Sequence, residues 1–435
     1  MTKKLPARNA DVAIIGGGII GCSTAYYTAK AGLNVLLVDK GAAGFEQSTR
    51  NWGWVHQQVR HPHLIPFAMY SRQLWAGLEA ELGQALEWRM GGNLSIASTQ
   101  THMAAFEDYQ RKAMAAGLET QLLTAEQTQA MLPGVNASVA GALYIDSDGQ
   151  ANPHLATRAF ANAAAEAGAT IIEGCVANHV LCADNTVQGV ATELGEVKAE
   201  QVVIAGGAWS RRLLKPLGIK LPQNAIRSTV IRTTPAPQFT QATGWASGTA
   251  FRQDVNGQFI LAAGAKSTYD VNLDALTDWL SFGSSAWRFR RQLKLSVGKP
   301  LLRDLAALIP GTQAHRSIWS ALRTNEPPPD LNAAAPNLQG FQQLFPQFEN
   351  LAVDKIWAGN IDMTPDQAPV LDAQAGIDGL IIATGFSGHG FAMGPGGGHA
   401  TSLLLQGKTP KPELHGFRLS RFAENDLPEM AEFHP

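Results

Sequence analysis

Residues 11–40 read DVAIIGGGIIGCSTAYYTAKAGLNVLLVDK. A short apolar run rich in β-branched residues leads into a turn with the spacing G-x-G-x-x-G, made by Gly16, Gly18 and Gly21. A helix-forming segment follows and stops at Gly32, and a second apolar run ends at Asp39. The order strand, glycine turn, helix, strand within about 30 residues predicts a βαβ unit.

The acidic residue at the end of the second strand indicates what the glycine turn binds. Asp39 lies 18 residues beyond Gly21 (39 − 21), where an acidic residue accepts hydrogen bonds from the ribose of a dinucleotide. The glycines let the backbone approach the pyrophosphate at the helix N-terminus. We therefore expect Gly16, Gly18, Gly21 and Asp39 to bind a dinucleotide; the alternative is a βα turn with chance glycines.

Two later segments repeat the step from buried strand to glycine: VVIAGGAWS at 202–210 and DGLIIATG at 378–385. Ligands bind at the carboxyl ends of parallel strands, so three such ends in one sheet line one long crevice. The chain then has a discontinuous nucleotide-binding domain at 1–92, 146–222 and 352–435. A second domain, for substrate, takes 93–145 and 223–351. The predicted fold class is α/β (α+β overall), a Rossmann-like domain with a second, mixed-sheet domain.

Two features favour FAD over NAD as the dinucleotide. The fingerprint lies near the start of the chain and the last strand returns to the same sheet near its end, so the cofactor is contacted from both. The glycine-rich stretch 385–398 also leads into a helix expected to begin near Gly396–Gly398. Its N–H groups suit the N1–C2=O edge of the flavin, which becomes anionic on reduction. A NAD-binding module without flavin is the plainest alternative.

The composition argues against a nucleic-acid-binding, disulfide-rich, metal-binding or membrane-spanning protein. The 435 residues are 45% hydrophobic and 16% charged, with a formal net charge of −2, so we expect a globular protein without a nucleic-acid partner. The cysteines, Cys22, Cys175 and Cys182, have no disulfide or metal-binding spacing, which predicts reduced thiols, no metal site and a cytoplasmic location. No apolar run reaches the roughly 18–20 residues of a transmembrane helix.

Four motifs carry a family likeness: DVAIIGGGIIGCSTAYYTAKAGLNVLLVDK, VRHPHLIPFAMYSRQLW, VVIAGGAWS and IIATGFSGHGFAMG. In this order they resemble the glycine oxidase and D-amino-acid oxidase family of FAD-dependent amine oxidoreductases, and most closely its monomeric sarcosine oxidase branch. The resemblance implies an FAD-dependent enzyme that oxidises the carbon–nitrogen bond of an amino acid or secondary amine.

The resemblance extends the expected FAD contacts beyond the fingerprint. Lys40 is expected beside the adenosine, and Val176 is expected to meet the adenine through its backbone. The region that wraps the pyrophosphate and flavin matches Ser48, Thr49 and Arg50. Ala205, Gly206 and Trp209, in the VVIAGGAWS segment, match the place where the family's chain passes the cofactor a second time. The loop beneath the flavin pyrimidine matches Gly385, Gly388, Gly390, Phe391 and Ala392.

Two residues are implied near the substrate. Arg60 aligns with an arginine that resembles the family's clamp on the substrate carboxylate, a role that suits the guanidinium fork. The alternative is a solvated surface arginine. His389, in the GHGF motif, resembles a histidine beside the flavin that bonds the flavin C2=O or orients substrate; otherwise it is a structural histidine.

Three positions depart from the sarcosine oxidase pattern. Gly359 stands where that branch has the cysteine that bonds the flavin, which predicts non-covalent FAD. Ala392 replaces a lysine that helps to bind carboxylate. The lysine that primes oxygen falls at about Ala262, and losing a charge that stabilises developing superoxide raises the odds of a dehydrogenase with a quinone or protein acceptor.

We therefore expect hydride transfer from an amine-bearing carbon to flavin N5, followed by hydrolysis of the imine. Alternatives are a 2-hydroxy-acid dehydrogenase on the same fold and the flavoprotein subunit of a larger amine or opine-type dehydrogenase complex. Trp52 and Trp54 either wall an apolar pocket for a larger amine or pack the domain junction. The electron-acceptor partner and the formation of a homo-oligomer stay open.

Overall fold

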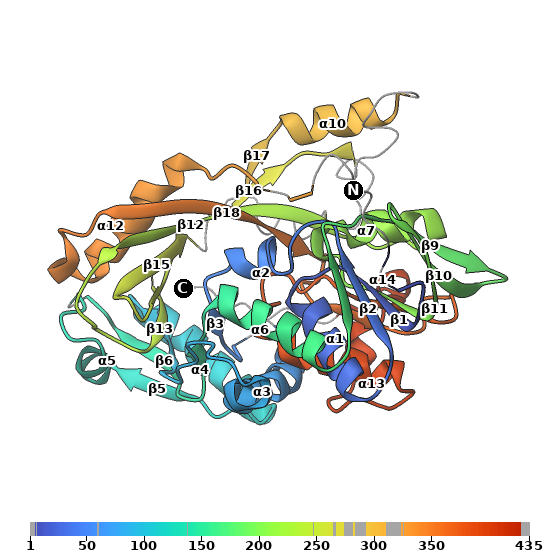
Figure 1. Cartoon of the computed structure of the whole chain (residues 1–435). Coiled ribbons are helices and arrows are strands. Elements are labelled where there is room, and N and C mark those ends of the chain that lie inside the picture. Colours follow the sequence, from blue (N-terminus) through green and yellow to red (C-terminus); the bar gives the residue numbers. More distant parts are fainter. Residues whose placement is uncertain are drawn as a thin grey trace.

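The computed structural model describes residues 5, 7–58, 61–136, 138–246, 248–263, 267–273, 282, 293–309, 323–324 and 326–427. Two sheets lie side by side in Figure 1, the sheet that contains β1 and β2 on the right and a second sheet on the left. Helices cover the sheets, and β12 and β18 run along the top of the view between the two halves. The predicted α/β class with a second, mixed sheet is confirmed.

The first sheet has eight strands, six of them in the order β19-β20-β11-β1-β2-β8. The five from β20 to β8 are mutually parallel, and β19 and the β9–β10 hairpin are antiparallel additions. The strands are β1 Asn9–Ile15, β2 Val35–Asp39, β8 Thr170–Glu173, β9 Ala177–Ala183, β10 Thr186–Thr192, β11 Gly195–Ile204, β19 Val370–Asp372 and β20 Leu380–Thr384. With α1 Ile19–Lys30 between β1 and β2, the predicted βαβ unit is present.

Helices α3 Ile65–Leu82, α6 Pro153–Glu166 and α13 Gly394–Leu405 pack with α1 around one apolar core. Glycines bring α13 close to its neighbours. A Cβ at Gly398 would lie 2.0 Å from Ser23 Oγ, and one at Gly396 would lie 2.7 Å from Ser71 Cβ. The N–H of Gly396 donates to Ser71 Oγ at 3.0 Å. The helix thus begins slightly before the expected position, and its glycines serve helix packing.

The second sheet has ten strands: β4 Asn93–Ala97, β5 Gln121–Thr124, β6 Gly141–Ile145, β12 Asn224–Pro235, β13 Thr243–Ala246, β14 Thr249–Gln253, β15 Gln258–Ala263, β16 Ser267–Asp270, β17 Leu293–Ser296 and β18 Val353–Met363. The helices described in this half include α4 Gln100–Ala115, α5 Ala125–Met131, α10 Lys299–Ala307 and α12 Ala334–Leu344. Phenylalanines from β14, β15 and α12 form a buried cluster, with Phe259 and Phe341 ring centroids 4.6 Å apart.

Strand β18 connects the two halves of the molecule. It lies in the predicted piece 352–435 of the nucleotide domain, yet it pairs with β12 from Asn224–Met363 to Thr233–Val353. Short elements complete the junction: α2 Gln47–Arg50, β3 Trp54–Val55, β7 Gly149–Gln150 and α7 Ser210–Leu214. The last predicted piece of the nucleotide domain therefore contributes its first strand to the second sheet.

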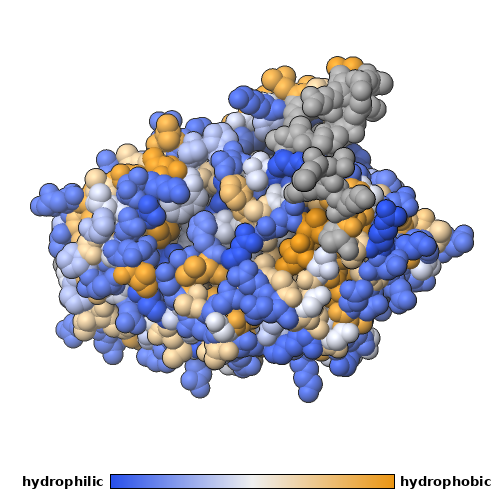
Figure 2. Space-filling view, in the orientation of Figure 1, coloured by the Kyte–Doolittle hydropathy of each residue, from blue (hydrophilic) through white to orange (hydrophobic). Residues whose placement is uncertain are grey.

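Hydrophilic side chains cover most of the face seen in Figure 2, and hydrophobic ones gather mainly right of centre. Within the described ranges, no helix combines the length and apolar character needed to cross a bilayer.

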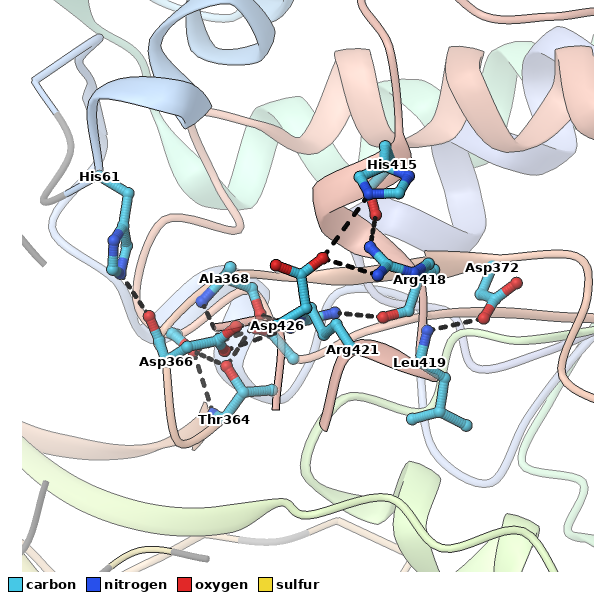
Figure 3. Close-up of polar contacts among 12 residues, drawn as sticks. His61, Thr364, Asp366, Ala368, Asp372, His415, Arg418, Leu419, Arg421 and Asp426 are labelled. Atoms are coloured by element: carbon cyan, nitrogen blue, oxygen red, sulfur yellow. Dashed lines mark hydrogen bonds and ion pairs between the residues drawn. The ribbon is translucent and has the colours of Figure 1, made fainter. Parts of the chain in front are cut away.

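A buried ion pair ties the end of the described chain to the segment that follows β18 (Figure 3). Arg421, in α14 Arg421–Glu424, is fully buried, and Asp366 is 3% exposed. Arg421 Nε and Nη2 donate to the two oxygens of Asp366 at 2.7 and 3.2 Å. Nη2 also donates to the carbonyl of Ala368 at 2.9 Å, to which Thr364 Oγ1 donates at 2.8 Å. This pair holds the 364–368 segment in place.

Replacing Arg421 by Met is expected to lower the free energy of unfolding by about 3–5 kcal/mol, because Asp366 is left as a buried, uncompensated charge. Urea denaturation of both proteins measures the difference. The matched control is Arg111→Met, which breaks an exposed pair with Asp108 and should change stability little. Equal effects of the two substitutions would contradict the structural role of the Arg421 pair.

Candidate active site

Three parallel strands end side by side at one edge of the first sheet. Ile204 of β11 lies opposite Ile15 of β1 on one side and opposite Ile382 of β20 on the other. An open crevice runs along this edge, with about 1390 Å³ of empty space when its opening to solvent is included. The prediction that the three strand ends meet is confirmed.

The turn between β1 and α1 leaves no space for side chains. Gly16 has a φ of +112°, and a Cβ there would lie 2.4 Å from the carbonyl oxygen of Ala205. A Cβ at Gly21 would lie 1.8 Å from the carbonyl oxygen of Gly16. Gly16 thus permits the approach of two strand ends, and Gly21 lets α1 start directly against the turn. Gly18, beside Ser48, faces the crevice.

Asp39 lies in the crevice with both carboxylate oxygens hydrogen-bonded. Its Oδ2 accepts from the N–H of Gly17 at 2.6 Å, and its Oδ1 accepts from the N–H of Gly41 at 2.7 Å. Burial raises the pKa of Asp39, and the two hydrogen bonds act in the opposite direction. Because each oxygen keeps a second lone pair, this oriented carboxylate can accept hydrogen bonds from a ribose.

Other polar groups line the crevice beyond Asp39. Lys40 forms an ion pair with Glu46, and its ammonium lies 4.5 Å from the centroid of the Trp209 ring. The backbone of Val176 is engaged by Glu193: its N–H donates to Glu193 Oε1 at 3.0 Å, and its carbonyl accepts from the Glu193 N–H at 2.9 Å. The contact of Val176 with adenine stays a prediction.

Most of the predicted cofactor residues line this crevice: Gly16, Gly18, Asp39, Lys40, Ser48, Arg50, Val176, Ala205, Gly206, Trp209, Gly388, Gly390 and Phe391. Gly21, Thr49, Gly385 and Ala392 lie outside its lining. Thr49 Oγ1 bonds the carbonyl oxygen of Glu46 at 3.3 Å, within its own helix. Gly385 has a φ of +73° and donates its N–H to Asp362 Oδ2 at 2.8 Å, so it shapes the loop.

Asp362 is a crevice residue that the sequence did not reveal. It stands near the end of β18 and is hydrogen-bonded by the loop at Gly385. Burial raises the pKa of its carboxyl to about 6. No motif marks this residue, because it reaches the crevice only through the path of β18 between the two sheets.

Taken together, these features fit a bound dinucleotide. The backbone can be approached at Gly18, the N-terminus of α1 is available to a pyrophosphate, and Asp39 is oriented toward a ribose. The N–H of Ile19 in the first turn of α1 donates to Ser48 Oγ at 2.8 Å, which places this hydroxyl at the same spot.

A second, open cavity lies beside the crevice, with about 1420 Å³ of empty space when its opening to solvent is included. The two share the lining residues Gln47, Arg50, Asn51, Ile361, Gly388 and Phe391. A continuous row of five aromatic rings lines the second cavity: Trp245, Trp52, Trp54, His56 and His389, with successive centroids 6.2, 5.3, 5.8 and 5.3 Å apart. The row extends from the second sheet to the glycine loop.

The structure places His389 and Ala392 in this second cavity. His389 Nδ1 lies 3.3 Å from His56 Nε2. Burial lowers the pKa of His56 to about 4, so this histidine is neutral at neutral pH. The predicted carboxylate clamp, Arg60, lies outside the described residues.

The structure shows the surroundings of Gly359 and Ala262, two positions that depart from the sarcosine oxidase pattern. Gly359 lines the second cavity, and a Cβ there would lie 2.2 Å from Gln47 Oε1 and 3.0 Å from Arg50 Cβ. A cysteine at this position would therefore require the Gln47 side chain to move and would press against Arg50 Cβ. Ala262 is fully buried on β15, in an apolar cluster with Val230 against which Trp52 packs.

Several lining residues were not singled out from the sequence, among them His56, Gln58, Ser95, Ser228 and Trp245. The first two follow Trp52 and Trp54 in an alternating pattern, W-x-W-x-H-x-Q, which would have indicated one exposed strand face. Trp245 comes from β13 of the second sheet, and no local pattern links it to them. In the part of the chain that the structure describes, no group of His, Cys, Asp and Glu is arranged to hold a metal.

Comparisons with known proteins agree with this geometry. The family model described as "DAO: FAD dependent oxidoreductase" matches residues 11–404. Glycine oxidase of Bacillus subtilis (strain 168) is 24% identical over 425 residues, which cover 95% of this chain and 98% of that protein. Mitochondrial sarcosine dehydrogenase of Homo sapiens is 23% identical over 438 residues, which cover 97% of this chain but 42% of that longer protein.

The fold has a solved counterpart as well. The structure of L-amino acid deaminase from Proteus myxofaciens, in complex with anthranilate, superposes with a TM-score of 0.90 at 24% identity, covering 97% of this chain and 95% of that one. The family likeness expected from the motifs is confirmed. The chain belongs to the DAO family of FAD-dependent oxidoreductases.

Proposed function

We propose that the protein uses non-covalently bound FAD to oxidise the carbon–nitrogen bond of an amino acid or secondary amine, giving an imine that water hydrolyses. The observation that carries the proposal is the junction of the two cavities. A crevice with dinucleotide-binding features adjoins an aromatic cavity, and Gly388 and Phe391 line both. The glycine oxidase, sarcosine dehydrogenase and L-amino acid deaminase relatives are named for such substrates.

The protein's own part in this reaction is to hold the substrate and keep its nitrogen lone pair free. FAD, when bound, supplies the two-electron acceptor. An ammonium group has no lone pair to assist oxidation of the adjacent carbon, so the reactive form is the free amine. None of the described residues that line the second cavity is an aspartate or glutamate. The described part of the lining therefore provides no carboxylate to stabilise an ammonium, and His56 is neutral.

The aromatic row indicates the size of the substrate. Trp52 and Trp245 are stacked with an interplanar angle of 29°, and Trp54 meets Trp52 edge to face. Indole faces provide large, rigid apolar contact surfaces. We therefore propose a substrate whose side chain is bulky and apolar, in preference to one the size of glycine.

The carboxylate contact and the electron acceptor complete the proposal. Arg60 is the proposed carboxylate clamp on the basis of the family motif. A quinone or dye-type acceptor is preferred to oxygen, because Ala262 gives no positive charge where the sarcosine oxidase pattern has lysine. Its buried, apolar surroundings support this preference.

The purified protein is expected to be yellow, and acid precipitation should release its FAD into the supernatant. The physical reason is the position of Gly359, where no thiol is present to bond the flavin. Absorbance spectra of the supernatant and the pellet measure the partition. A yellow pellet would contradict non-covalent binding, and a colourless native protein would contradict the function itself.

Anaerobic mixing with a panel of amines tests the reaction. L- and D-amino acids with large apolar side chains should bleach the flavin at lower concentration than glycine or sarcosine, because they contact the tryptophans. Re-oxidation by air or by a dye then identifies the acceptor. Bleaching by 2-hydroxy acids alone would replace amine oxidation with alcohol oxidation.

The rate of bleaching is expected to rise with pH, by about tenfold per unit below the pKa of the substrate amine. The sign follows because protonation removes the lone pair, and His56, with a pKa of about 4, is a poor base for the ammonium. Anaerobic stopped-flow over a pH series measures this. The apparent pKa should move with the substrate; a fixed value near neutral pH for every substrate would instead indicate a protein base.

A further inference from the structure

The last residues of β18 form a wall between the crevice and the second cavity. Asn360 and Asp362 line the crevice and not the second cavity. Gly359 and Met363 line only the second cavity, and Ile361 borders both. Because successive side chains of a strand point to opposite sides, this alternation directs Asn360 and Asp362 into the crevice. Both residues are partly exposed rather than buried, so a ligand in the crevice can reach them.

The end of β20 positions the carboxyl of Asp362. Its Oδ2 accepts the N–H of Gly385 at 2.8 Å and the hydroxyl of Thr384 at 3.5 Å. A carboxylate has about four acceptor sites, so acceptor capacity remains for a ligand. The pKa of this carboxyl, raised by burial to about 6, leaves it mainly ionised at neutral pH.

Asp362 differs from the other carboxylates of the crevice in having no cation beside it. The described lining contains three carboxylates: Asp39, Glu46 and Asp362. Glu46 pairs with Lys40 and accepts the indole N–H of Trp209 at 2.8 Å. Asp362 has no ion-pair partner among the described residues. An unpaired carboxylate repels a phosphate and accepts from hydroxyl groups, so its chemistry selects a neutral, hydroxyl-bearing part of the ligand.

Asn360 places an amide next to this carboxyl on the same face of β18. None of the described residues hydrogen-bonds its side chain. Residues two apart on a strand are separated by about 6.5 Å along the chain. An amide both donates and accepts, so Asn360 and Asp362 together suit neighbouring hydroxyls of one extended molecule.

The position of the pair along the crevice identifies which part of a dinucleotide it meets. The strands that end at the crevice follow the order β20-β11-β1-β2. Asp39 ends β2 and the N-terminus of α1 follows β1, whereas Gly385, which contacts Asp362, follows β20. A dinucleotide with a ribose at Asp39 and its pyrophosphate at α1 therefore reaches Asp362 with the portion beyond the pyrophosphate. In FAD that portion begins with the ribityl chain, an open chain of hydroxyl-bearing carbons.

We propose that Asn360 and Asp362 bind the ribityl hydroxyls of FAD. This inference rests on the proposed function and names side chains that recognise the flavin half of the cofactor. Each hydroxyl can donate to the carboxylate and accept from the amide. Ile361 and Met363 present apolar side chains on the opposite side, so the same strand separates this polar contact from the aromatic cavity.

The test uses the full-length chain, freed of flavin and titrated with FAD or with ADP by isothermal titration calorimetry. ADP lacks both the ribityl chain and the flavin. Asp362→Asn removes the charge and keeps an oxygen for the N–H of Gly385. Asp354→Asn is the matched control, because Asp354 lies on the same strand, pairs with Arg232 and is outside both linings. Asp39→Asn reports on the adenosine half.

Asp362→Asn should weaken FAD binding by about tenfold, the loss expected for one hydrogen bond to a charged acceptor, and leave ADP binding unchanged. Asn360→Ala should weaken FAD binding by roughly threefold, as for a neutral hydrogen bond. Asp39→Asn should weaken both ligands, and Asp354→Asn neither. Unchanged FAD affinity in Asp362→Asn, or an equal loss for FAD and ADP, would overturn the proposal.

FAD analogues that each lack one ribityl hydroxyl give a second measurement, which does not depend on how well a single variant folds. For the hydroxyl that Asp362 binds, its removal and Asp362→Asn should be non-additive. Additive losses for every hydroxyl, with FAD still bound by the wild type, would overturn the ribityl assignment alone. Wild-type protein that binds ADP but not FAD would overturn the proposed function.

Discussion

The backbone contact between Gly16 and Ala205 is the constraint on which the cofactor half depends. Two turns that are far apart in sequence meet where a single Cβ would lie 2.4 Å from a carbonyl oxygen. Because β1 and β11 run side by side up to this contact, their flanking strands bring Asp39 to one side of the crevice and Thr384 to the other. A glycine with positive φ therefore sets the width of a site whose other parts come from three separate regions of the chain.

The second cavity exists because β18 continues the second sheet and then leads back to the first. Gly359 lines that cavity, Asp362 lines the crevice, and the next residues pack under the glycine loop, where Thr364 N–H donates to Ser387 Oγ at 3.1 Å. The Arg421–Asp366 pair holds the same segment from the opposite side. One continuous stretch thus connects the crevice, the second cavity and α14, so the two halves are not independent bodies joined by a linker.

The parts that the sequence predicted are those encoded locally. The turn at Gly16, the acid at Asp39 and the two later strand ends each follow from short patterns of apolar residues and glycine. The positions of residues such as Asp362 and Trp245 depend on which strands pair in the second sheet, and no short sequence pattern predicts that pairing. The glycines near 396 add a packing role that the sequence did not show, because α1 and α3 occupy the space a Cβ would need. A high glycine content indicates that the backbone lies close to another group, and the folded structure is needed to identify that group.

Asp148 holds Gln57, between two residues of the second cavity, at a cost in stability. Asp148 is fully buried, its Oδ2 has no hydrogen-bond partner, and burial raises its pKa to about 7. An apolar residue would be easier to bury there. Yet the carboxyl fixes Gln57 through two hydrogen bonds to one oxygen, and Gln57 separates two cavity residues that face the other way. Asp148 lies outside the lining of both cavities. We infer that this buried carboxyl acts through Gln57, because the two hydrogen bonds to Gln57 hold the backbone between His56 and Gln58, which line the second cavity.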